Sequence, residues 1–487
     1  MTVALTQIAG DSVALPSGAN RIEISGITAD SREVRPGYLF AALPGTAADG
    51  ARFIPQAIAA GAVAVICTPD AEVPDRAVAL RTANPREMFA KAAARFYGRQ
   101  PDLIVAVTGT NGKTSVAAFV RQIWERMGFR AASLGTIGVI GPSGVEYLQH
   151  TTPDPAKLHA TLARLAEDHV THLALEASSH GLSQFRLDGV RMAAGAFTNL
   201  TQDHLDYHET LEEYFAAKMR LFAELLPAGS PAVINADSPR APQVLAIAER
   251  RGLRSYLVGE AGSDLKLLRS RQEGFGQALR LQTASGQHDI LLPLAGAFQA
   301  SNALVAAGLV IAAGGEENQA LRALESLHGA KGRLDLAARS AQDAPIFVDY
   351  AHTPDALENA LATLRPYASR KLALVFGCGG DRDRGKRPLM GAIAARLADR
   401  VIVTDDNPRS EDPTHIRAAI LAAAPGAIEI ADRALAIRNA VEALGEGDVL
   451  LVAGKGHEEG QIIGKETRPF SDHDAVSAAV RGEDYHG

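Results

Sequence analysis

Residues 104–128 constrain the fold of this chain more than any other part of the sequence. The stretch begins with Ile-Val-Ala-Val at 104–107, a β-branched run typical of a parallel strand buried on both faces. A turn of small and polar residues follows at 108–115. A helical pattern then continues to Gly128, which stands where a left-handed residue usually ends a helix. The sequence therefore predicts a strand, a glycine turn and a helix in direct succession.

Such a turn is suited to binding phosphate. Free backbone N–H groups and the positive end of the helix dipole attract the anion, and Gly109 and Gly112 let the backbone approach it. Lys113 would reach the β- and γ-phosphates, and Thr114 would hold Mg²⁺. The general P-loop pattern has a further glycine where this chain has Val107, so the loop is shorter. The alternative is an ordinary strand-turn-helix connection, but the glycines, lysine and threonine together favour a nucleotide phosphate site.

Composition limits the class of protein. A chain of 487 residues is too long for one hydrophobic core and suggests three domains. A net charge of −7 argues against a nucleic-acid partner. The N-terminus lacks the pattern of a signal peptide, and the most apolar run, 303–313, is too short to cross a bilayer. We expect a cytoplasmic protein without membrane insertion, in which Cys67 and Cys378 are buried thiols.

The pattern along the chain predicts an α/β protein with three domains, at 1–102, 103–335 and 336–487. The first alternates short strands with helices, and a polar segment at 98–102 ends it. From 103 to about 335 strands and helices alternate, as a doubly wound parallel sheet requires. The α/β rhythm restarts after 336, with strands expected at 346–348, 372–376, 401–403 and 449–452.

Two strands of the central domain end in polar residues. Glu176 closes the strand at 173–176, and His204 follows the strand at 194–197. Ligands bind beyond the carboxyl ends of strands in open α/β sheets, so both residues are expected beside the phosphate loop. Alone, an acid at a strand end is often only solvated, and a lone histidine is more often a surface or core residue. With the phosphate loop, they indicate a Mg²⁺ site.

Three strand ends of the last domain also carry polar clusters. The glycine-rich turn at 377–387 lacks the glycine spacing of a dinucleotide fingerprint, and its four basic and two acidic residues fit a small zwitterionic or anionic ligand better. Further clusters stand at 405–409 and 453–458. Because all three follow predicted strands, we expect one site.

With these clusters in chain order, the sequence resembles the Mur ligases over its whole length. The motifs that carry the resemblance are GTNGKTS (109–115), TTPDP (151–155), EASSHGL (176–182), TNLTQDHLDYH (198–208), VDYAHTPDAL (348–357), GCGGDRDRGKRPLM (377–390) and DNPR (406–409). The resemblance implies an N-terminal domain for the UDP part of a substrate, a central ATPase domain with Mg²⁺, and a Rossmann-like C-terminal domain for an incoming amino acid. It is closest to the branch that joins meso-diaminopimelate to UDP-N-acetylmuramoyl-L-alanyl-D-glutamate through an acyl phosphate. We expect a monomer.

The resemblance also implies residue roles. The catalytic positions are Lys113, Glu176, His204 and Lys218. The ATP contacts are Gly109, Thr110, Asn111, Gly112, Lys113, Thr114, Ser115, Asn302, Arg333, Asp349 and His352. The UDP-substrate contacts are Ser31, Thr46, Ala47, Ala48, Thr151, Thr152, Ser178, Gln184 and Arg186. The diaminopimelate contacts are Arg382, Asp406, Asn407, Pro408, Arg409, Gly454 and Glu458. The metal positions are Thr114, Glu176, His204 and a carbamylated Lys218.

Two of these roles have a direct chemical reason. A carbamate would turn Lys218 from a cation into an anion able to bind a second Mg²⁺, whereas without the resemblance a helical lysine is expected to be solvated. Arg409 can pair bidentately with the distal carboxylate of diaminopimelate, which lysine lacks. The chain departs from its relatives at His150 and at Gln299, which often are asparagine.

Other readings remain open at this point. A lysine-adding Mur ligase is disfavoured by Arg382 and Arg409, and a folylpolyglutamate-type ligase by the Asp-Ser-Arg segment at 30–32 and the N-terminal domain. From another class, a P-loop kinase or motor would transfer phosphate to a hydroxyl or couple ATP hydrolysis to a macromolecule.

Overall fold

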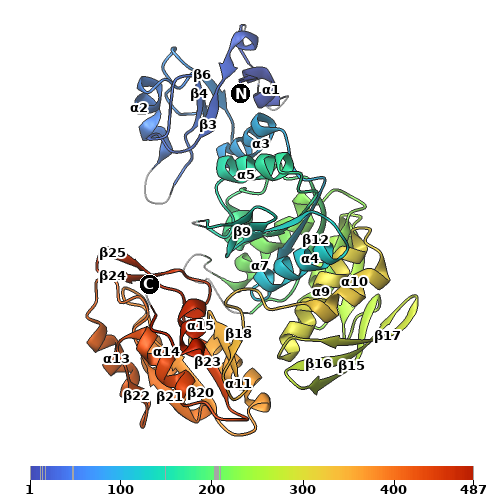
Figure 1. The fold of residues 1–487 in the computed structure, drawn as a ribbon. Coiled ribbons are helices and arrows are strands. Elements are labelled where there is room, and N and C mark those ends of the chain that lie inside the picture. Colours follow the sequence, from blue (N-terminus) through green and yellow to red (C-terminus); the bar gives the residue numbers. More distant parts are fainter. Residues whose placement is uncertain are drawn as a thin grey trace. The chain divides into compact units, whose positions relative to one another are not determined.

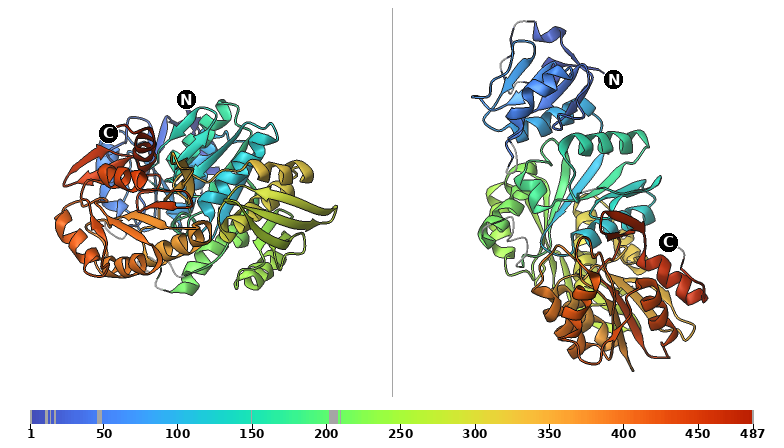
Figure 2. Two further views of the ribbon diagram at one scale, coloured as in Figure 1. Left: turned by 60° about the horizontal axis from the view of Figure 1, so that its bottom comes forward. Right: turned by 90° about the vertical axis from the view of Figure 1, so that its left-hand side faces the viewer.

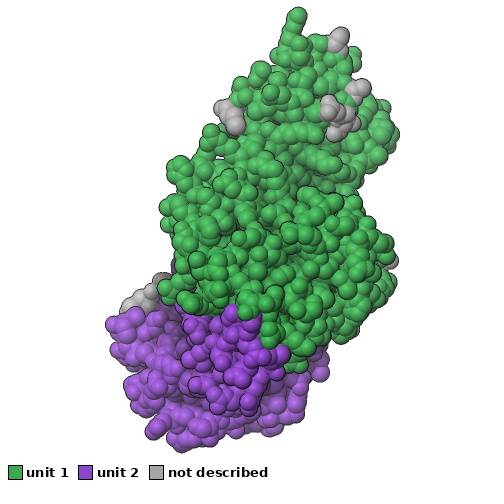
Figure 3. Space-filling model, turned by 90° about the vertical axis from the view of Figure 1, so that its right-hand side faces the viewer, with its two compact units in different colours: residues 1–267, 282–285, 304–323 green, residues 268–281, 286–303, 324–487 purple. Residues whose placement is uncertain are grey.

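The computed structural model describes residues 2–10, 13, 15–16, 18–45, 49–148, 150–201, 208 and 210–485. The chain divides into two compact units (Figure 3). Unit 1 comprises Met1–Leu267, Gln282–Ser285 and Leu304–Ala323, and unit 2 comprises Leu268–Leu281, Gly286–Ala303 and Leu324–Gly487. The three domain ranges expected from the sequence stay a prediction, but each contains a sheet of its own.

The N-terminal part of unit 1 is built on a small parallel sheet of order β3-β4-β5-β6 (Figure 1). Its two faces follow the alternation of the strands: Leu39 and Ile66 pack with Phe89 of α3, whereas Phe40 and Val65 pack with Ile54 of α2. The elements are β1 (Val3–Ala4), α1 (Leu5–Ala9), η2 (Ala19–Arg21), β2 (Glu23–Ile24), β3 (Gly26–Thr28), β4 (Tyr38–Ala41), η3 (Gly50–Phe53), α2 (Ile54–Ala59), β5 (Ala64–Cys67), β6 (Val78–Arg81) and α3 (Pro85–Tyr97).

The second sheet has the order β10-β9-β8-β11-β7-β12-β13-β14-β15-β16-β17. Strands β8, β11, β7, β12, β13 and β14 pair in parallel, so their carboxyl ends lie at one edge. The strands are β7 (Leu103–Thr108), β8 (Ala131–Gly135), β9 (Gly138–Gly141), β10 (Gly144–Glu146), β11 (His172–Glu176), β12 (Met192–Phe197), β13 (Pro231–Asn235), β14 (Arg254–Gly259), β15 (Leu265–Glu273), β16 (Gly276–Thr283) and β17 (Gly286–Leu292).

Helices connect the parallel strands from β7 to β14, as expected from the sequence, and further helices follow β17. They are α4 (Lys113–Arg126), α5 (Pro155–Glu167), α6 (Ser179–Ser183), α7 (Leu211–Arg220), the π-helical turn η4 (Leu221–Leu225), α8 (Ala241–Arg250), α9 (Ala297–Ala312), α10 (Glu317–Ala323) and η5 (Leu324–Ser326). The expected alternation of strand and helix does not hold at 265–292, where β15, β16 and β17 follow one another. Gly274 stands in the two-residue turn between β15 and β16, and Gly286 follows the two-residue turn and opens β17; both have positive φ. Such short turns favour hairpins over helical crossovers.

Unit 2 contains a six-stranded sheet of order β18-β19-β23-β20-β21-β22 with helices on both faces (Figure 2). Alternate strand residues face α11 to α13 on one side and α14 and α15 on the other, which places one core on each face. The elements are β18 (Asp335–Arg339), β19 (Pro345–Asp349), α11 (Pro354–Leu364), η6 (Arg365–Tyr367), β20 (Leu372–Phe376), α12 (Lys386–Leu397), β21 (Arg400–Val403), α13 (Pro413–Leu421), β22 (Ile428–Glu429), α14 (Arg433–Glu442), β23 (Val449–Ala453), β24 (Gly460–Ile463), β25 (Glu466–Pro469) and α15 (Asp472–Arg481).

The mixed α/β fold confirms the fold class expected from the sequence. Strands expected at 346–348, 372–376, 401–403 and 449–452 are β19, β20, β21 and β23. Both cysteines are buried thiols. Within the described residues, no helix combines the length and the apolar character that a membrane crossing demands.

Candidate active site

The glycine loop between β7 and α4 has the backbone shape expected of a phosphate site. Gly109 has φ 146° and Gly112 has φ 87°. A Cβ at Gly109 would lie 1.9 Å from Thr198 Oγ1, so the loop is packed directly against the residue that follows β12. Thr110 N donates to Asn199 O at 2.9 Å. Only glycine fits this conformation and this close approach. Helix α4 begins directly after the loop at Lys113, with Thr114 and Ser115 in its first turn.

Two lysines converge on the loop. Lys113 Nζ donates to Gly109 O at 2.8 Å and to Thr110 O at 2.7 Å. Lys218 Nζ, carried by α7, also donates to Gly109 O at 2.8 Å. Lys218 is only 1% exposed, and its Nζ lies 4.1 Å from the centre of the Tyr214 ring. The sequence alone read Lys218 as solvated, whereas the fold places it beneath the phosphate loop.

Glu176 lies beside the start of α4. Its Oε2 accepts from Thr114 Oγ1 at 3.1 Å, and its two oxygens accept from Thr136 N at 2.8 Å and Thr136 Oγ1 at 3.1 Å. The carboxylate is 2% exposed and lies against Gly135, where a Cβ would come within 2.0 Å of Oε1. A hydroxyl and a carboxylate side by side are hard oxygen donors of the kind that Mg²⁺ prefers, so this pair fits the expected ion.

Thr136 was missed by the sequence reading. It follows β8, whose carboxyl end lies at the same sheet edge as that of β11, and the rule that located Glu176 would have located Thr136 as well. His204, the other metal position expected from the sequence, lies outside the described residues. Among the residues described, no three histidine, cysteine, aspartate or glutamate side chains gather as a metal cluster.

The residues expected to hold the muramoyl-dipeptide form one hydrogen-bonded cluster next to Glu176. Thr152 Oγ1 donates to Glu176 O at 3.0 Å and lies 2.9 Å from Ser178 Oγ. Arg186 Nη1 donates to Thr152 O at 2.6 Å, and Arg186 Nη2 donates to Gln184 Oε1 at 2.7 Å. The fifth residue of the set, Thr151, lies 3.0 Å from Thr136 through their hydroxyls. The cluster therefore joins the backbone carbonyl of Glu176 to Arg186 through Thr152, while Thr136 connects the Glu176 carboxylate to Thr151.

The N-terminal part contributes Ser31, which stands in the turn after β3. Ser31 Oγ donates to Gln56 Oε1 at 3.4 Å. A cavity of about 510 Å³ next to this turn is lined by Arg32, Arg35 and Lys157, together with residues of β3, β4, α3 and α5. Thr46, Ala47 and Ala48, the other residues expected at the UDP group, lie outside the described residues.

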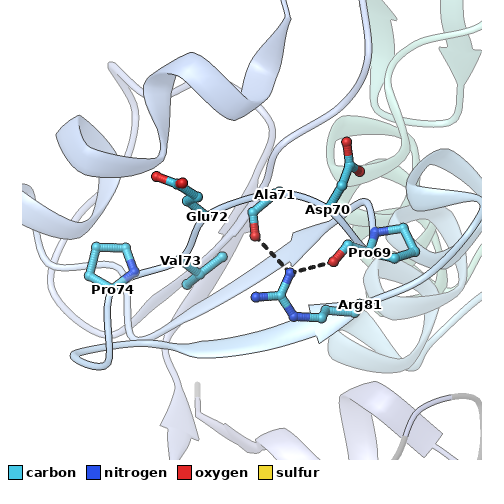
Figure 4. Close-up of a pocket in the computed structure, with 7 residues that line it drawn as sticks. All are labelled: Pro69, Asp70, Ala71, Glu72, Val73, Pro74 and Arg81. Atoms are coloured by element: carbon cyan, nitrogen blue, oxygen red, sulfur yellow. Dashed lines mark hydrogen bonds between the residues drawn. The ribbon is translucent and has the colours of Figure 1, made fainter.

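Figure 4 shows a different cavity of the N-terminal part, of about 540 Å³, lined by residues 69–74 and Arg81. Arg81 Nη1 donates to Pro69 O at 2.9 Å and to Ala71 O at 2.7 Å. The guanidinium thus stabilises the loop that it faces, and no residue expected at a substrate lines this cavity.

Unit 2 holds the other ATP contacts expected from the sequence. Asp349 closes β19, and its carboxylate accepts from Leu334 N at 2.6 Å and Ala351 N at 2.7 Å. Burial raises the pKa of Asp349, and the nearby Arg333 guanidinium opposes that rise. His352 follows, with Nδ1 2.9 Å from Tyr350 O.

Gln299, a departure from the relatives, has a definite place in the structure. Its Nε2 donates to Arg333 O at 3.2 Å, and its Oε1 accepts from Asn302 Nδ2 at 3.4 Å. Gln299 is 1% exposed. It therefore links the two residues that the resemblance places at the nucleotide.

The strand ends of the six-stranded sheet come together as expected. Arg409 Nη1 donates to Gly380 O at 2.9 Å, and Asn407 Nδ2 donates to Glu458 Oε2 at 2.8 Å. A Cβ at Gly379 would lie 2.8 Å from Arg409 Nη1 and 3.9 Å from Arg382 Cγ, so the glycine turn approaches both guanidinium side chains.

Gly454 and Asp406 are also adjacent, since a Cβ at Gly454 would lie 2.6 Å from Asp406 Oδ2. Pro408 stands between Asn407 and Arg409. Arg409 has φ 51°, a left-handed backbone, and its N donates to Ile462 O at 3.0 Å. The hairpin β24–β25 thus fixes the segment that carries Arg409. The sequence did not predict this hairpin, and it placed Lys455 in the polar cluster at 453–458 without predicting its burial.

The central sheet carries a phosphate loop beside a buried hydroxyl and carboxylate of the kind that Mg²⁺ prefers. The doubly wound sheet of unit 2 carries a charged cluster that fits a small zwitterionic ligand. These two features define an ATP-using α/β enzyme. Three family models match the chain: "Mur ligase family, catalytic domain" at 23–97, "Mur ligase middle domain" at 107–310 and "Mur ligase, glutamate ligase domain" at 332–456. The chain belongs to the Mur ligase family.

Ligases of known name are similar to this chain over nearly its whole length, and a more distant ligase shares the fold over a smaller part. A protein of Bradyrhizobium diazoefficiens, named UDP-N-acetylmuramoyl-L-alanyl-D-glutamate–2,6-diaminopimelate ligase, is 56% identical over 98% of this chain and 99% of its own. A solved structure of a ligase with the same name shares 34% identity over 99% of both chains, with a TM-score of 0.75. The folylpolyglutamate synthase of Mycobacterium tuberculosis, solved with ADP, shares the fold at 21% identity, covering 76% of this chain and 91% of its own, with a TM-score of 0.60.

Proposed function

We propose that this chain is the ATP-dependent ligase that joins meso-diaminopimelate to the D-glutamyl side-chain carboxylate of UDP-N-acetylmuramoyl-L-alanyl-D-glutamate, in peptidoglycan precursor synthesis. The observation that carries the proposal is the 56% identity to a ligase of that name across 98% of this chain. The charged cluster around Arg409 supports the choice of amino acid. We further propose that the enzyme acts in the cytoplasm as a monomer, with domains at 1–102, 103–335 and 336–487.

The chemistry requires activation of a carboxylate, which is a poor electrophile. Its oxygen attacks the γ-phosphorus of ATP and ADP leaves; the amine then attacks the acyl carbon, phosphate leaves, and the amine loses a proton. Lys113 and the loop N–H groups at 109–115 hold the phosphates and stabilise charge that develops there. Mg²⁺, when bound at Thr114 and Glu176, neutralises phosphate charge. The Thr152, Ser178 and Arg186 cluster, joined to Glu176, orients the acceptor.

The remaining ligand contacts are proposed from the family pattern. For ATP these are Asn302, Arg333, Asp349 and His352, and for the UDP group Ser31 with residues 46–48. The cavity next to the turn that carries Ser31 supports the latter, because three cationic side chains, Arg32, Arg35 and Lys157, line it beside a single acid, Glu33. Arg32 is paired with Asp30, so Arg35 and Lys157 are the cations best suited to a diphosphate.

Lys218 is proposed to act as a carbamate. Its burial and its 2.8 Å contact with Gly109 O put it within reach of the phosphate loop. We expect Lys218→Ala to lose activity and to regain part of it with added short carboxylates, which would supply the missing anion. Full activity of the variant without additions would contradict this role.

Arg409 is proposed to select diaminopimelate over lysine. With lysine bound, no carboxylate would pair with the half-buried Arg409 guanidinium, whose Nη1 is held by Gly380 O. A desolvated, unpaired charge costs several kcal/mol, on the order of 2–5. This corresponds to a preference of at least thirtyfold in kcat/KM.

The test is phosphate release with ATP, the UDP-muramoyl dipeptide and a panel of amino acids. We expect release only with both substrates present, and far better with meso-diaminopimelate than with L-lysine. Arg409→Met should lose most of this preference, whereas wild-type turnover with L-lysine equal to that with diaminopimelate would overturn the proposal.

A further inference from the structure

Lys455 is a charged side chain with no exposed surface. It follows β23, and its side chain is 0% exposed. Its ammonium has three N–H groups and three acceptors: Gly460 O at 2.6 Å, Glu458 Oε2 at 3.0 Å and Asn407 Oδ1 at 3.1 Å. Burying an ammonium is costly unless each donor is satisfied, so this geometry requires all three acceptors to stay in place.

The contact with Lys455 determines which way the Asn407 amide is oriented. Asn407 Oδ1 accepts from Lys455 Nζ and from Ile462 N, the latter at 2.9 Å. Because both neighbours are donors, the oxygen must occupy this position, and the Nδ2 group is left to donate to Glu458 Oε2 at 2.8 Å. The opposite amide orientation would set the amide N–H groups against two other donors.

The same contact selects one oxygen of Glu458. Oε2 receives both Lys455 Nζ and Asn407 Nδ2, whereas Oε1 has no protein hydrogen bond among the described residues. The Glu458 side chain is 31% exposed. Oε1 is therefore the oxygen that remains for a cation from outside the protein.

We propose that Lys455 is a positioning residue for the amino-acid substrate: it holds Asn407 and Glu458 so that Glu458 Oε1 accepts the distal ammonium of diaminopimelate. This inference rests on the proposed function. Arg409, joined to Asn407 O through Nη1 at 3.5 Å, stands on the same segment. The distal end of diaminopimelate, a carboxylate and an ammonium on one carbon, needs this combination of a cation and an anion.

Lys455 could affect diaminopimelate binding through its charge or by positioning Asn407 and Glu458. The two explanations predict opposite changes in affinity when a neutral residue replaces Lys455. If the Lys455 charge acted only by offsetting the charge of Glu458, its removal would make the electrostatic potential at Glu458 more negative. The ammonium of diaminopimelate would then bind more tightly. If Lys455 acts by fixing the two side chains, its removal frees them to rotate, and diaminopimelate binds more weakly.

The experiment compares Lys455→Met with Lys465→Met, a matched control at an exposed lysine in the turn between β24 and β25. We expect Lys455→Met to raise the KM for meso-diaminopimelate at least tenfold, with KM for ATP and for the UDP-dipeptide within twofold of wild type. The control should match wild type in all three. Acyl phosphate formed without amino acid, trapped by hydroxylamine as a hydroxamate with loss of phosphate, should persist in both variants.

A second readout separates positioning from general loosening. The substrate analogue 2-aminopimelate lacks the distal amino group, so wild type should discriminate against it strongly, and Lys455→Met should discriminate at least fivefold less. Lys455→Gln, which keeps two N–H donors, should lie between the two and serves if the methionine variant unfolds. An unchanged or lowered KM for diaminopimelate, or unchanged discrimination, would overturn the inference. Absence of diaminopimelate-dependent turnover in wild type would instead overturn the proposed function.

Discussion

The ion pair between Arg433 and Asp472 allows a stability prediction for unit 2. Arg433 Nε and Nη2 donate to the two Asp472 oxygens at 2.7 and 2.8 Å, and both side chains are 0% exposed. Arg433 Nη2 also donates to Ala453 O at 3.0 Å, the last residue of β23. Burial lowers the pKa of Arg433, but Asp472 together with Asp406 and Glu458 raises it, and the net shift is upward, so the guanidinium remains charged.

Asp472→Asn should destabilise unit 2 by about 3–5 kcal/mol, because it leaves a buried guanidinium without its counter-charge. At about 2–4 °C per kcal/mol for a unit of this size, the unfolding transition should fall by roughly 6–20 °C. Scanning calorimetry of the whole chain would follow this transition. Because Asp472 lies in the first turn of α15, loss of its favourable interaction with the helix dipole adds to the effect.

Two controls make the reasoning refutable. The double variant Arg433→Met with Asp472→Leu removes both charges, and its transition should recover to near the wild-type temperature or above it. Arg438→Gln breaks the surface pairs with Glu442 and Asp484 and should leave the transition temperature unchanged. The reasoning would be refuted if Asp472→Asn lowered the transition temperature by less than about 3 °C, or if the double variant were no more stable than the single one. Either result would show that the loss of stability does not come from an unpaired buried charge.

Three further outcomes are expected. Gly109→Ala should weaken ATP binding at least tenfold by calorimetry, because its Cβ would collide with Thr198 Oγ1; an unchanged affinity would contradict the loop geometry. Burial lowers the pKa of His159 to about 4, so the unfolded chain binds more protons between about pH 6.5 and 4 and stability falls on acidification through that window, by about 3 kcal/mol in all. His159→Gln should flatten the dependence of the urea unfolding midpoint on pH, and an equally steep dependence would argue against it. Gln299→Leu should weaken ATP binding by about five- to tenfold through loss of its bonds to Asn302 and the backbone, with the dipeptide KM unchanged; equal losses for both substrates would point to unfolding instead.

The parts of the site that the sequence predicted are those fixed by local signals and by strand direction. The β7–α4 loop needs only glycines, a lysine and a helix start, all contiguous. Glu176 could be placed beside Thr114 because parallel strands end at one sheet edge, and the two lie 3.1 Å apart through Thr114 Oγ1. The polar clusters at 377–387, 405–409 and 453–458 lie close together for the same reason, because each follows a parallel strand of one sheet.

Other parts depend on packing that no local pattern encodes. The sequence placed Lys455 in the polar cluster at 453–458 but could not predict its burial, because the burial arises where β24 packs over Asn407. The alternation of strand and helix expected from 103 to about 335 is wrong at 265–292, where three strands follow one another. The short turns between them favour hairpins, and the prediction did not take those turns into account. The Arg433–Asp472 pair joins the starts of two helices that are 39 residues apart in the sequence. No local sequence pattern around either residue indicates that the other is its partner.

Lys218 illustrates how the fold changes the chemistry of a residue type. Its contact with Gly109 O uses one N–H, and a carbamate also retains one N–H on the same nitrogen, so the modification can keep that hydrogen bond. It would lose the attraction of a cation for the Tyr214 ring, now 4.1 Å away, and would add two oxygens beyond the nitrogen. The ammonium form repels an incoming metal ion, whereas the carbamate form attracts it. The modification is therefore favoured only when a cation is present to interact with the new charge, which predicts that carbamylation and Mg²⁺ binding at Thr114 and Glu176 strengthen one another.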